Sequence, residues 1–243
     1  MLYMIGIGLA TEKDISLRAL EIIKKCNFVY LESYTSKLQC SIKSLERLYN
    51  KRIILADRNL VENKSKEILE RARNKNVAFL IIGDVFSATT HISLLMEARK
   101  RKIRTKIIHN ASILTAVGET GLELYKFGKV TSIPFENKDI KTPIEVFKNN
   151  CKNELHTLFL LDLDPVKNRF MSVKDAIEYL IKNNINKNLK AIACIALGSE
   201  NAVIKLDKLE KLKTFKINRF PQCLIIPARK LHFIEEEALE LWR

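Results

Sequence analysis

Glycine is scarce in this chain, and three of its glycines mark the ends of apolar runs. Only seven glycines stand among 243 residues. Gly6 and Gly8 follow the apolar residues that begin the chain, and Gly83 closes the run from Val77 to Ile82. A residue without a Cβ lets the chain turn sharply at a strand end and lets the backbone approach a ligand closely. Because open α/β sheets form their ligand crevice at the carboxyl ends of strands, these positions predict a binding site there.

Strand-like and helix-like segments alternate along the chain. The predicted strands are Met1–Gly6, Phe28–Leu31, Arg52–Leu55, Val77–Ile82, Thr105–His109, Leu155–Asp162, Ala191–Leu197 and Cys223–Pro227. The predicted helices are Ser16–Lys25, 42–48, Ser65–Asn74, Ser172–Lys182 and Glu235–Leu241. This rhythm is typical of a mostly parallel sheet, although it is less regular in the second half. A small, apolar segment begins at residue 110, so we predict two α/β lobes, residues 1–109 and 110–243.

The composition indicates a globular protein. Hydrophobic residues make up 47% of the chain, and no apolar stretch approaches the roughly 20 residues of a membrane span. The first apolar run ends too early for a signal peptide, so we expect a cytoplasmic protein that does not bind membranes. Five cysteines lie scattered without C-x-x-C spacing, which predicts reduced structural thiols and no zinc site.

The formal net charge of +14 raises the possibility of nucleic-acid binding. The densest basic segment, Arg99–Lys106, contains no aromatic residues on which bases could stack. A lysine-rich surface therefore explains the charge better than a nucleic-acid site does, and attraction to an acidic or RNA-associated protein fits it equally.

The motifs at the strand ends exclude some chemistries and leave others open. Gly6 and Gly8 lack the third glycine of a dinucleotide fingerprint, because position 11 is Thr. The segment Gly83–His91 supplies a turn, an acid and hydroxyls, but an ordinary strand-to-helix turn with a capping Thr would look the same. Nothing resembles a Ser-His-Asp triad. We expect the four separated histidines to be partly buried and hydrogen-bonded rather than metal ligands.

Blocks spread over the chain from residue 2 to about 239 resemble the diphthine synthase family, which belongs to the tetrapyrrole-methylase superfamily. They are Leu2–Leu9, Asp14–Ile15, Tyr30–Ser36, Gly83–Asp84, Ala88–His91, Ile108–Ile113, Gly121–Gly128, Ser132–Phe135, Leu155–Leu158, Leu161–Asp162 and Lys230–Leu239. They occur in one order and without large gaps, and several of them are not common in other α/β proteins.

The resemblance implies a bilobal α/β fold of tetrapyrrole-methylase type, with the cofactor cleft between the lobes, and a homodimer. It implies S-adenosylmethionine as cofactor, S-adenosylhomocysteine as product and no metal. The implied substrate is translation elongation factor 2 carrying a 3-amino-3-carboxypropyl-histidine, whose amino group is methylated to give diphthine. No direct contact with nucleic acid is implied. The matching motif positions for the cofactor are Leu9, Asp84, Ser87, Ser112, Ile113, Leu161, Leu197 and Gln222.

Three departures from the family pattern concern single contacts. The chain has Val85–Ser87 where the family usually has a Pro and a later Val, so Ser87 is expected to contact the cofactor mainly through its backbone. Ile195–Ser199 lacks the family's arginine, and Gln222 replaces a usual histidine.

Other functions predict different behaviour. A tetrapyrrole or corrinoid-precursor methylase would bind a porphyrinoid. A basic nucleic-acid-binding module would bind RNA with a steep salt dependence and would not bind S-adenosylmethionine. An inactive relative would bind the cofactor and transfer nothing. For methyl transfer itself, the reacting amine must lose its proton to solvent or a nearby carboxylate, and Asp84 is expected to anchor the cofactor before it acts as a base.

Overall fold

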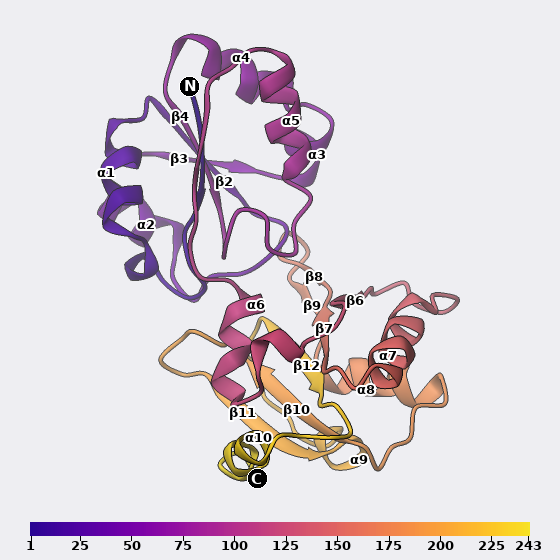
Figure 1. Cartoon of the computed structure of the whole chain (residues 1–243). Helices are drawn as coiled ribbons and strands as arrows, with labels where there is room; N and C mark the ends of the chain where they lie inside the picture. The colour runs from indigo at the N-terminus through magenta and orange to yellow at the C-terminus, as the bar shows by residue number, and fades with distance from the viewer. The chain divides into compact units, whose positions relative to one another are not determined.

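The computed structural model describes residues 1–243, which divide into two compact units, Met1–Leu114 and Thr115–Arg243 (Figure 1). The division falls within the short helix α6 (Ile113–Ala116), in the segment where the sequence changes character. None of the helices combines the length and the apolar character that crossing a bilayer requires. All five cysteines are free thiols.

Unit 1 contains a five-stranded parallel sheet. Its strands are β1 (Leu2–Gly6), β2 (Phe28–Glu32), β3 (Ile53–Ala56), β4 (Val77–Ile81) and β5 (Thr105–Ile108), in the order β3-β2-β4-β1-β5. Every residue of β4 is buried, which explains why this run is continuously apolar instead of alternating. The parallel sheet predicted for the first half of the chain is confirmed.

Helices cover both faces of this sheet, as Figure 1 shows. One face packs against α1 (Leu17–Lys25) and α2 (Ile42–Tyr49). The other packs against α3 (Arg58–Glu62), α4 (Lys66–Asn74) and α5 (Ile92–Lys100). The short helix η1 (Glu12–Asp14) follows β1. Side chains alternate between the faces, so that Phe79 lies in one core and Leu80 in the other.

Unit 2 contains a mixed sheet. Its strands are β6 (Thr131–Ile133), β7 (Thr157–Leu161), β10 (Lys190–Ile195), β11 (Val203–Lys208) and β12 (Gln222–Ile226), in the order β11-β10-β12-β7-β6. Only β6 and β7 pair in parallel. The hairpin β8 (Leu163–Asp164) and β9 (Arg169–Phe170) follows β7. The parallel rhythm of the first half therefore does not extend to this sheet.

The helices of unit 2 are α7 (Thr142–Lys152), α8 (Val173–Lys182), α9 (Leu209–Leu212) and α10 (Phe233–Glu240), with the short helices η2 (Val117–Thr120) and η3 (Leu124–Lys126). The cap predicted at Ser172 is confirmed, because its hydroxyl accepts the Asp175 N–H and the Asp175 carboxylate accepts the Ser172 N–H. The core of the unit packs α7, α8 and α9 against the sheet.

A buried charged network fixes α10 to the rest of unit 2. Glu235, fully buried, accepts hydrogen bonds from Lys126 Nζ at 2.6 Å and His156 Nε2 at 2.8 Å. It also accepts the backbone N–H groups of Glu123 and His232. Burial alone would raise the pKa of Glu235, but these donors bring it to about 2. Two of the blocks shared with the family, around residues 121–128 and 230–239, are thus joined by a structural ion pair.

Candidate functional site

The two strands that carry the scarce glycines lie side by side where the connections of the sheet diverge. After β1 the chain passes to α1 on one face, and after β4 it passes to α5 on the opposite face. Adjacent parallel strands whose connections leave to opposite faces open a crevice at their carboxyl ends, which is where ligands of open α/β sheets bind. The topology of unit 1 therefore places its candidate site between the ends of β1 and β4.

Two hydrogen bonds join the loops that follow these strands. The Gly8 N–H donates to the Gly83 carbonyl at 3.3 Å, and the Gly83 N–H donates to the Gly8 carbonyl at 2.7 Å. A Cβ at Gly6 would lie 2.6 Å from the Gly83 carbonyl oxygen, closer than real Cβ atoms approach. The backbones therefore approach each other more closely at Gly6 than any residue with a Cβ would permit.

Asp84, directly after Gly83, is a buried carboxylate with four hydrogen-bond donors. Its Oδ2 accepts from His109 Nδ1 at 2.8 Å and from the Asn110 N–H at 3.1 Å. Its Oδ1 accepts from the Phe86 N–H at 3.2 Å and from Ser87 Oγ at 3.4 Å. Burial opposes ionisation, but the bonds from His109, Phe86 and Asn110 outweigh it and hold the pKa of Asp84 below its usual value. Asp84 is thus ionised and fixed.

Asn110 ties the end of β5 to the end of β1. Its side-chain Nδ2 donates to the carbonyl oxygens of Gly6 and Asp14, each at 3.1 Å. The Asp14 carboxylate in turn accepts the N–H groups of Ala10 and Thr11. Loops after three neighbouring strands, β4, β1 and β5, are therefore held in one fixed arrangement.

The five predicted site residues of unit 1 all follow these three strands. The Cβ position that Gly83 lacks would lie 3.9 Å from a side-chain carbon of Leu9 and 3.9 Å from the Ser112 Cα. Ser87 donates its hydroxyl to Asp84, and Ile113 follows Ser112 at the start of α6. The unit therefore presents Leu9, Ser112 and backbone groups around the position that Gly83 leaves open.

The three predicted site residues of unit 2 lie at the same end of three neighbouring strands. Ile195 pairs with Gln222 across β10 and β12, and Leu160 pairs with Cys223 across β7 and β12. Leu161 is the last residue of β7, and Leu197 follows the end of β10 by two residues. Because β12 runs antiparallel to both strands, these two leucines lie at the end of the sheet where β12 begins. Their side chains are buried.

The Gln222 side chain is fully engaged within unit 2. Its Oε1 accepts the Val173 N–H at 2.8 Å, and its Nε2 donates to the Ile217 and Arg219 carbonyls at 2.9 Å each. An amide group makes few further hydrogen bonds once these three are formed. At this position the family usually has a histidine. In this chain Gln222 links the start of α8 to the segment before β12 through its hydrogen bonds.

The histidines differ from the sequence-based expectation. His91 and His156 are fully buried, whereas His109 and His232 are exposed, so the expected partial burial was wrong for all four, and the expected hydrogen bonding was wrong for His91. His91 packs against Tyr34 and Phe79, and neither of its ring nitrogens has a partner. Burial lowers the pKa of His91 to about 4, so its ring is neutral. No group of three or more His, Cys, Asp or Glu side chains is placed to hold a metal ion.

Sequence reasoning missed His109 and Asn110 as members of the site. Both lie in a block that resembles the family, directly after a predicted strand, but their role depends on a contact with Asp84 across 25 residues. Both residues lie at the end of the predicted strand that became β5, and residues at the carboxyl end of a parallel strand are candidates for a ligand site. That position could have identified them from the sequence.

Comparison with known proteins shows which family this chain resembles in sequence and in structure. Residues 1–213 match the model of the tetrapyrrole (corrin/porphyrin) methylases. The chain is 39% identical to the diphthine synthase of Archaeoglobus fulgidus over 241 residues, which cover 98% of this chain and 94% of that protein. It is 40% identical to the diphthine methyl ester synthase of Saccharomyces cerevisiae over 264 residues, which cover 98% and 88%. The latter alignment exceeds the 243 residues of this chain, so the yeast protein carries insertions that this chain lacks.

A solved structure agrees over the whole length. The crystal structure of a diphthine synthase superposes with a TM-score of 0.94 at 37% sequence identity, covering 100% of this chain and 96% of the other. The fold expected from the resemblance is confirmed. The family model, the full-length relatives and the solved structure establish that this chain belongs to the tetrapyrrole methylase family of methyltransferases.

Proposed function

We propose that this chain transfers methyl groups from S-adenosylmethionine to the amino nitrogen of 3-amino-3-carboxypropyl-histidine on translation elongation factor 2, giving diphthine. The observation that carries the proposal is the full-length similarity to a diphthine synthase, in sequence and in structure. The fixed loops at the carboxyl ends of β1, β4 and β5 support it, because they supply a preorganised binding surface at the switch point of a parallel sheet.

The residues at the proposed site suit this cofactor. S-adenosylmethionine combines an apolar adenine ring with a positively charged sulfonium and an amino acid group. Leu9 and Ile113 are partly exposed and offer apolar surface, and Leu161 and Leu197 are apolar side chains that are buried in unit 2. The main chain around Gly83 offers polar groups. Asp84 is ionised, so its charge favours a nearby cation. Because all four donors of Asp84 come from the protein, we propose that it acts through the shape and charge of its loop.

We further propose that Leu9, Asp84, Ser87, Ser112 and Ile113 of unit 1 and Leu161, Leu197 and Gln222 of unit 2 bind one cofactor molecule. Gln222 contributes by holding the surrounding backbone, because its own side chain is engaged. The homodimer that the resemblance implies and the cytoplasmic location expected from the sequence belong to the same proposal. Light scattering of the purified chain tests the dimer.

Bound S-adenosylmethionine supplies an electrophilic methyl group. Transfer to an amine is an in-line displacement, so the protein contributes chiefly by holding the nitrogen, the methyl carbon and the sulfur collinear. Such positioning can lower the barrier by about 7–11 kcal/mol in the best cases. The amine reacts only when it is neutral, because an ammonium group has no lone pair.

An alternative product is the methyl ester of diphthine, since some relatives of comparable identity are named diphthine methyl ester synthases. In that reaction the substrate's carboxylate oxygen also accepts a methyl group.

One experiment tests the function and separates the products. The purified chain is incubated with isotopically labelled S-adenosylmethionine and elongation factor 2 bearing the extended histidine, and the modified peptide is analysed by mass spectrometry. We expect three labelled methyl groups that survive mild base. A fourth, base-labile methyl group would identify the ester, and an unmodified peptide would refute the proposal.

A further inference from the structure

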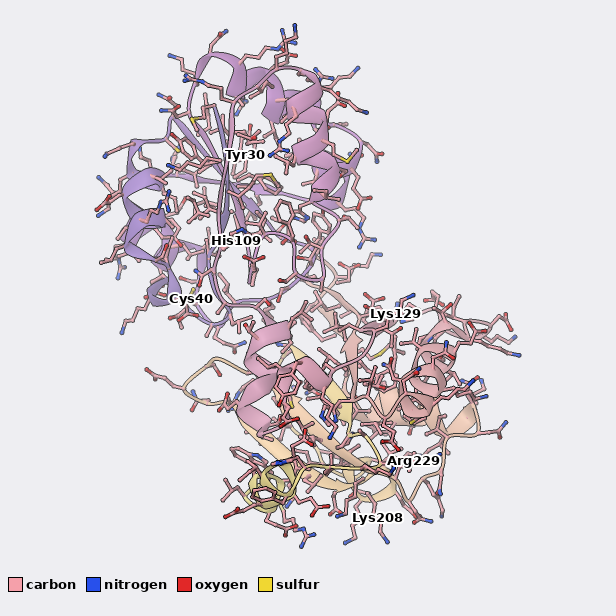
Figure 2. The ribbon with its side chains drawn as sticks, viewed as in Figure 1. Tyr30, Cys40, His109, Lys129, Lys208 and Arg229 are labelled. Atoms are coloured by element: carbon pink, nitrogen blue, oxygen red, sulfur yellow. The ribbon has the colours of Figure 1, made fainter.

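His109 is the exposed histidine at the candidate site of unit 1. It follows β5 directly, and Figure 2 labels it toward the end of the unit 1 sheet that carries the candidate site. Its side chain is 70% exposed, yet its ring is held in place because Nδ1 lies 2.8 Å from Asp84 Oδ2. The Phe86 ring packs edge-on against it, with ring centroids 6.4 Å apart. His109 therefore presents an imidazole of fixed orientation to solvent at the carboxyl ends of the unit 1 strands.

The contact with Asp84 determines which ring nitrogen carries the proton. Asp84 is ionised and can only accept hydrogen bonds, so His109 Nδ1 must donate. In the neutral imidazole the other nitrogen, Nε2, then holds an outward-facing lone pair. A carboxylate that fixes a histidine tautomer and stabilises the imidazolium is a general device for making the second nitrogen a proton acceptor.

The carboxylates of the site are not available for this role. The Asp84 oxygens accept four hydrogen bonds, and Asp14 Oδ2 accepts two backbone N–H groups. Asp84 follows β4, and Asp14 follows β1 together with the half-buried Glu12 of η1. Asp84 is the charged group in contact with the His109 ring. Of the other histidines, His91 and His156 are buried, and His232 caps α10 in unit 2. Nε2 of His109 is therefore an exposed basic atom at the carboxyl ends of these strands, where a substrate could reach it.

We propose that His109 Nε2 accepts the proton that the substrate's amino group releases before each methyl transfer, and that Asp84 positions the ring. The inference rests on the proposed function. The ammonium proton moves to Nε2, and the freed nitrogen lone pair forms the new N–CH3 bond while the electron pair of the breaking C–S bond stays on sulfur. Since the ring is exposed, the proton then passes to solvent. Three protons leave as three methyl groups arrive, so the charges balance.

The test compares His109→Gln with the wild type on the extended-histidine substrate. Glutamine keeps a side chain that can bond to Asp84 but cannot take up a proton. We expect kcat to fall by about 10²- to 10⁴-fold, with cofactor affinity, measured by calorimetry, within about twofold of the wild type. Added imidazole should restore activity to His109→Ala. His232→Gln is the matched control and should leave kcat unchanged.

A second measurement does not depend on turnover. Nitrogen NMR of the free enzyme should show His109 protonated on Nδ1 in the wild type, and Asp84→Asn should remove that preference. A kcat for His109→Gln within about threefold of the wild type, or an Nε2-protonated His109 in the wild type, would overturn the proposal. If the wild type itself adds no methyl group to the extended histidine, the proposed function fails instead, and the two failures are thereby distinguished.

Discussion

At the scale of single residues, Gly8 has a left-handed backbone conformation and packs closely against Asp14, and any other residue there would destabilise the fold. Its φ is +83°, and an added Cβ would lie 2.4 Å from the Asp14 Cβ, which must then move. We expect Gly8→Ala to destabilise the protein by about 2 kcal/mol or more, because a left-handed alanine alone costs roughly 1–2 kcal/mol. Urea unfolding measures the change. Gly118→Ala, without a positive φ and with only a flexible leucine nearby, is the control, and equal losses for the two variants would contradict the argument.

At the scale of elements, His91 makes the packing of α5 against the sheet sensitive to acid. Its pKa is about 4 in the folded protein, below the value near 6.5 of an exposed histidine. Below pH 6.5 the unfolded chain therefore binds a proton that the folded protein does not. Stability is lost as the pH falls from 6.5 towards 4, by about 2–3 kcal/mol at pH 4.5.

Replacing His91 by phenylalanine removes this titration and the two unpartnered ring nitrogens. We expect His91→Phe to lose about 2–3 kcal/mol less than the wild type between pH 7 and pH 4.5, measured by urea unfolding at both pH values. His232→Phe alters an exposed ring and should retain the acid sensitivity of the wild type. Parallel losses in the wild type and His91→Phe would show that His91 does not carry the effect.

The same scale shows how far the sequence predicts the fold. β1 and β4 were predictable because each is a largely buried, apolar run inside a parallel sheet. α3 has only five residues, and β11 is an edge strand whose lysines and aspartate weaken its apolar signal. The strand end at Asp84 could be found from the sequence. The sequence could not show that the side chains of Asp84 and Gln222 are already hydrogen-bonded within the protein, because some of their donors are far away in the chain.

At the scale of the whole molecule, the proposal of a shared cofactor site requires both units to contribute. We expect Leu9→Ala in unit 1 and Leu197→Ala in unit 2 each to weaken S-adenosylmethionine binding by about 5- to 30-fold, since each removes apolar contact worth roughly 1–2 kcal/mol. Calorimetric titration measures the affinities. Leu209→Ala removes a fully buried leucine from the core of unit 2, so it should lower the unfolding temperature without changing cofactor affinity. Binding that depends on one unit alone would refute the shared site.

The buried network of Lys126, His156 and Glu235 has a consequence for the order in which the molecule matures. Its carboxylate follows Lys126 by 109 residues and His156 by 79 residues in the chain, so both partners are synthesised well before it. Residues 1–114 can complete their sheet while translation continues, because all five strands precede that point. Until residue 235 is present, Lys126 and His156 lack the carboxylate that pairs with them. A chain cut before residue 235 would therefore keep every strand of unit 1 but would lack the buried network that fixes α10 in unit 2.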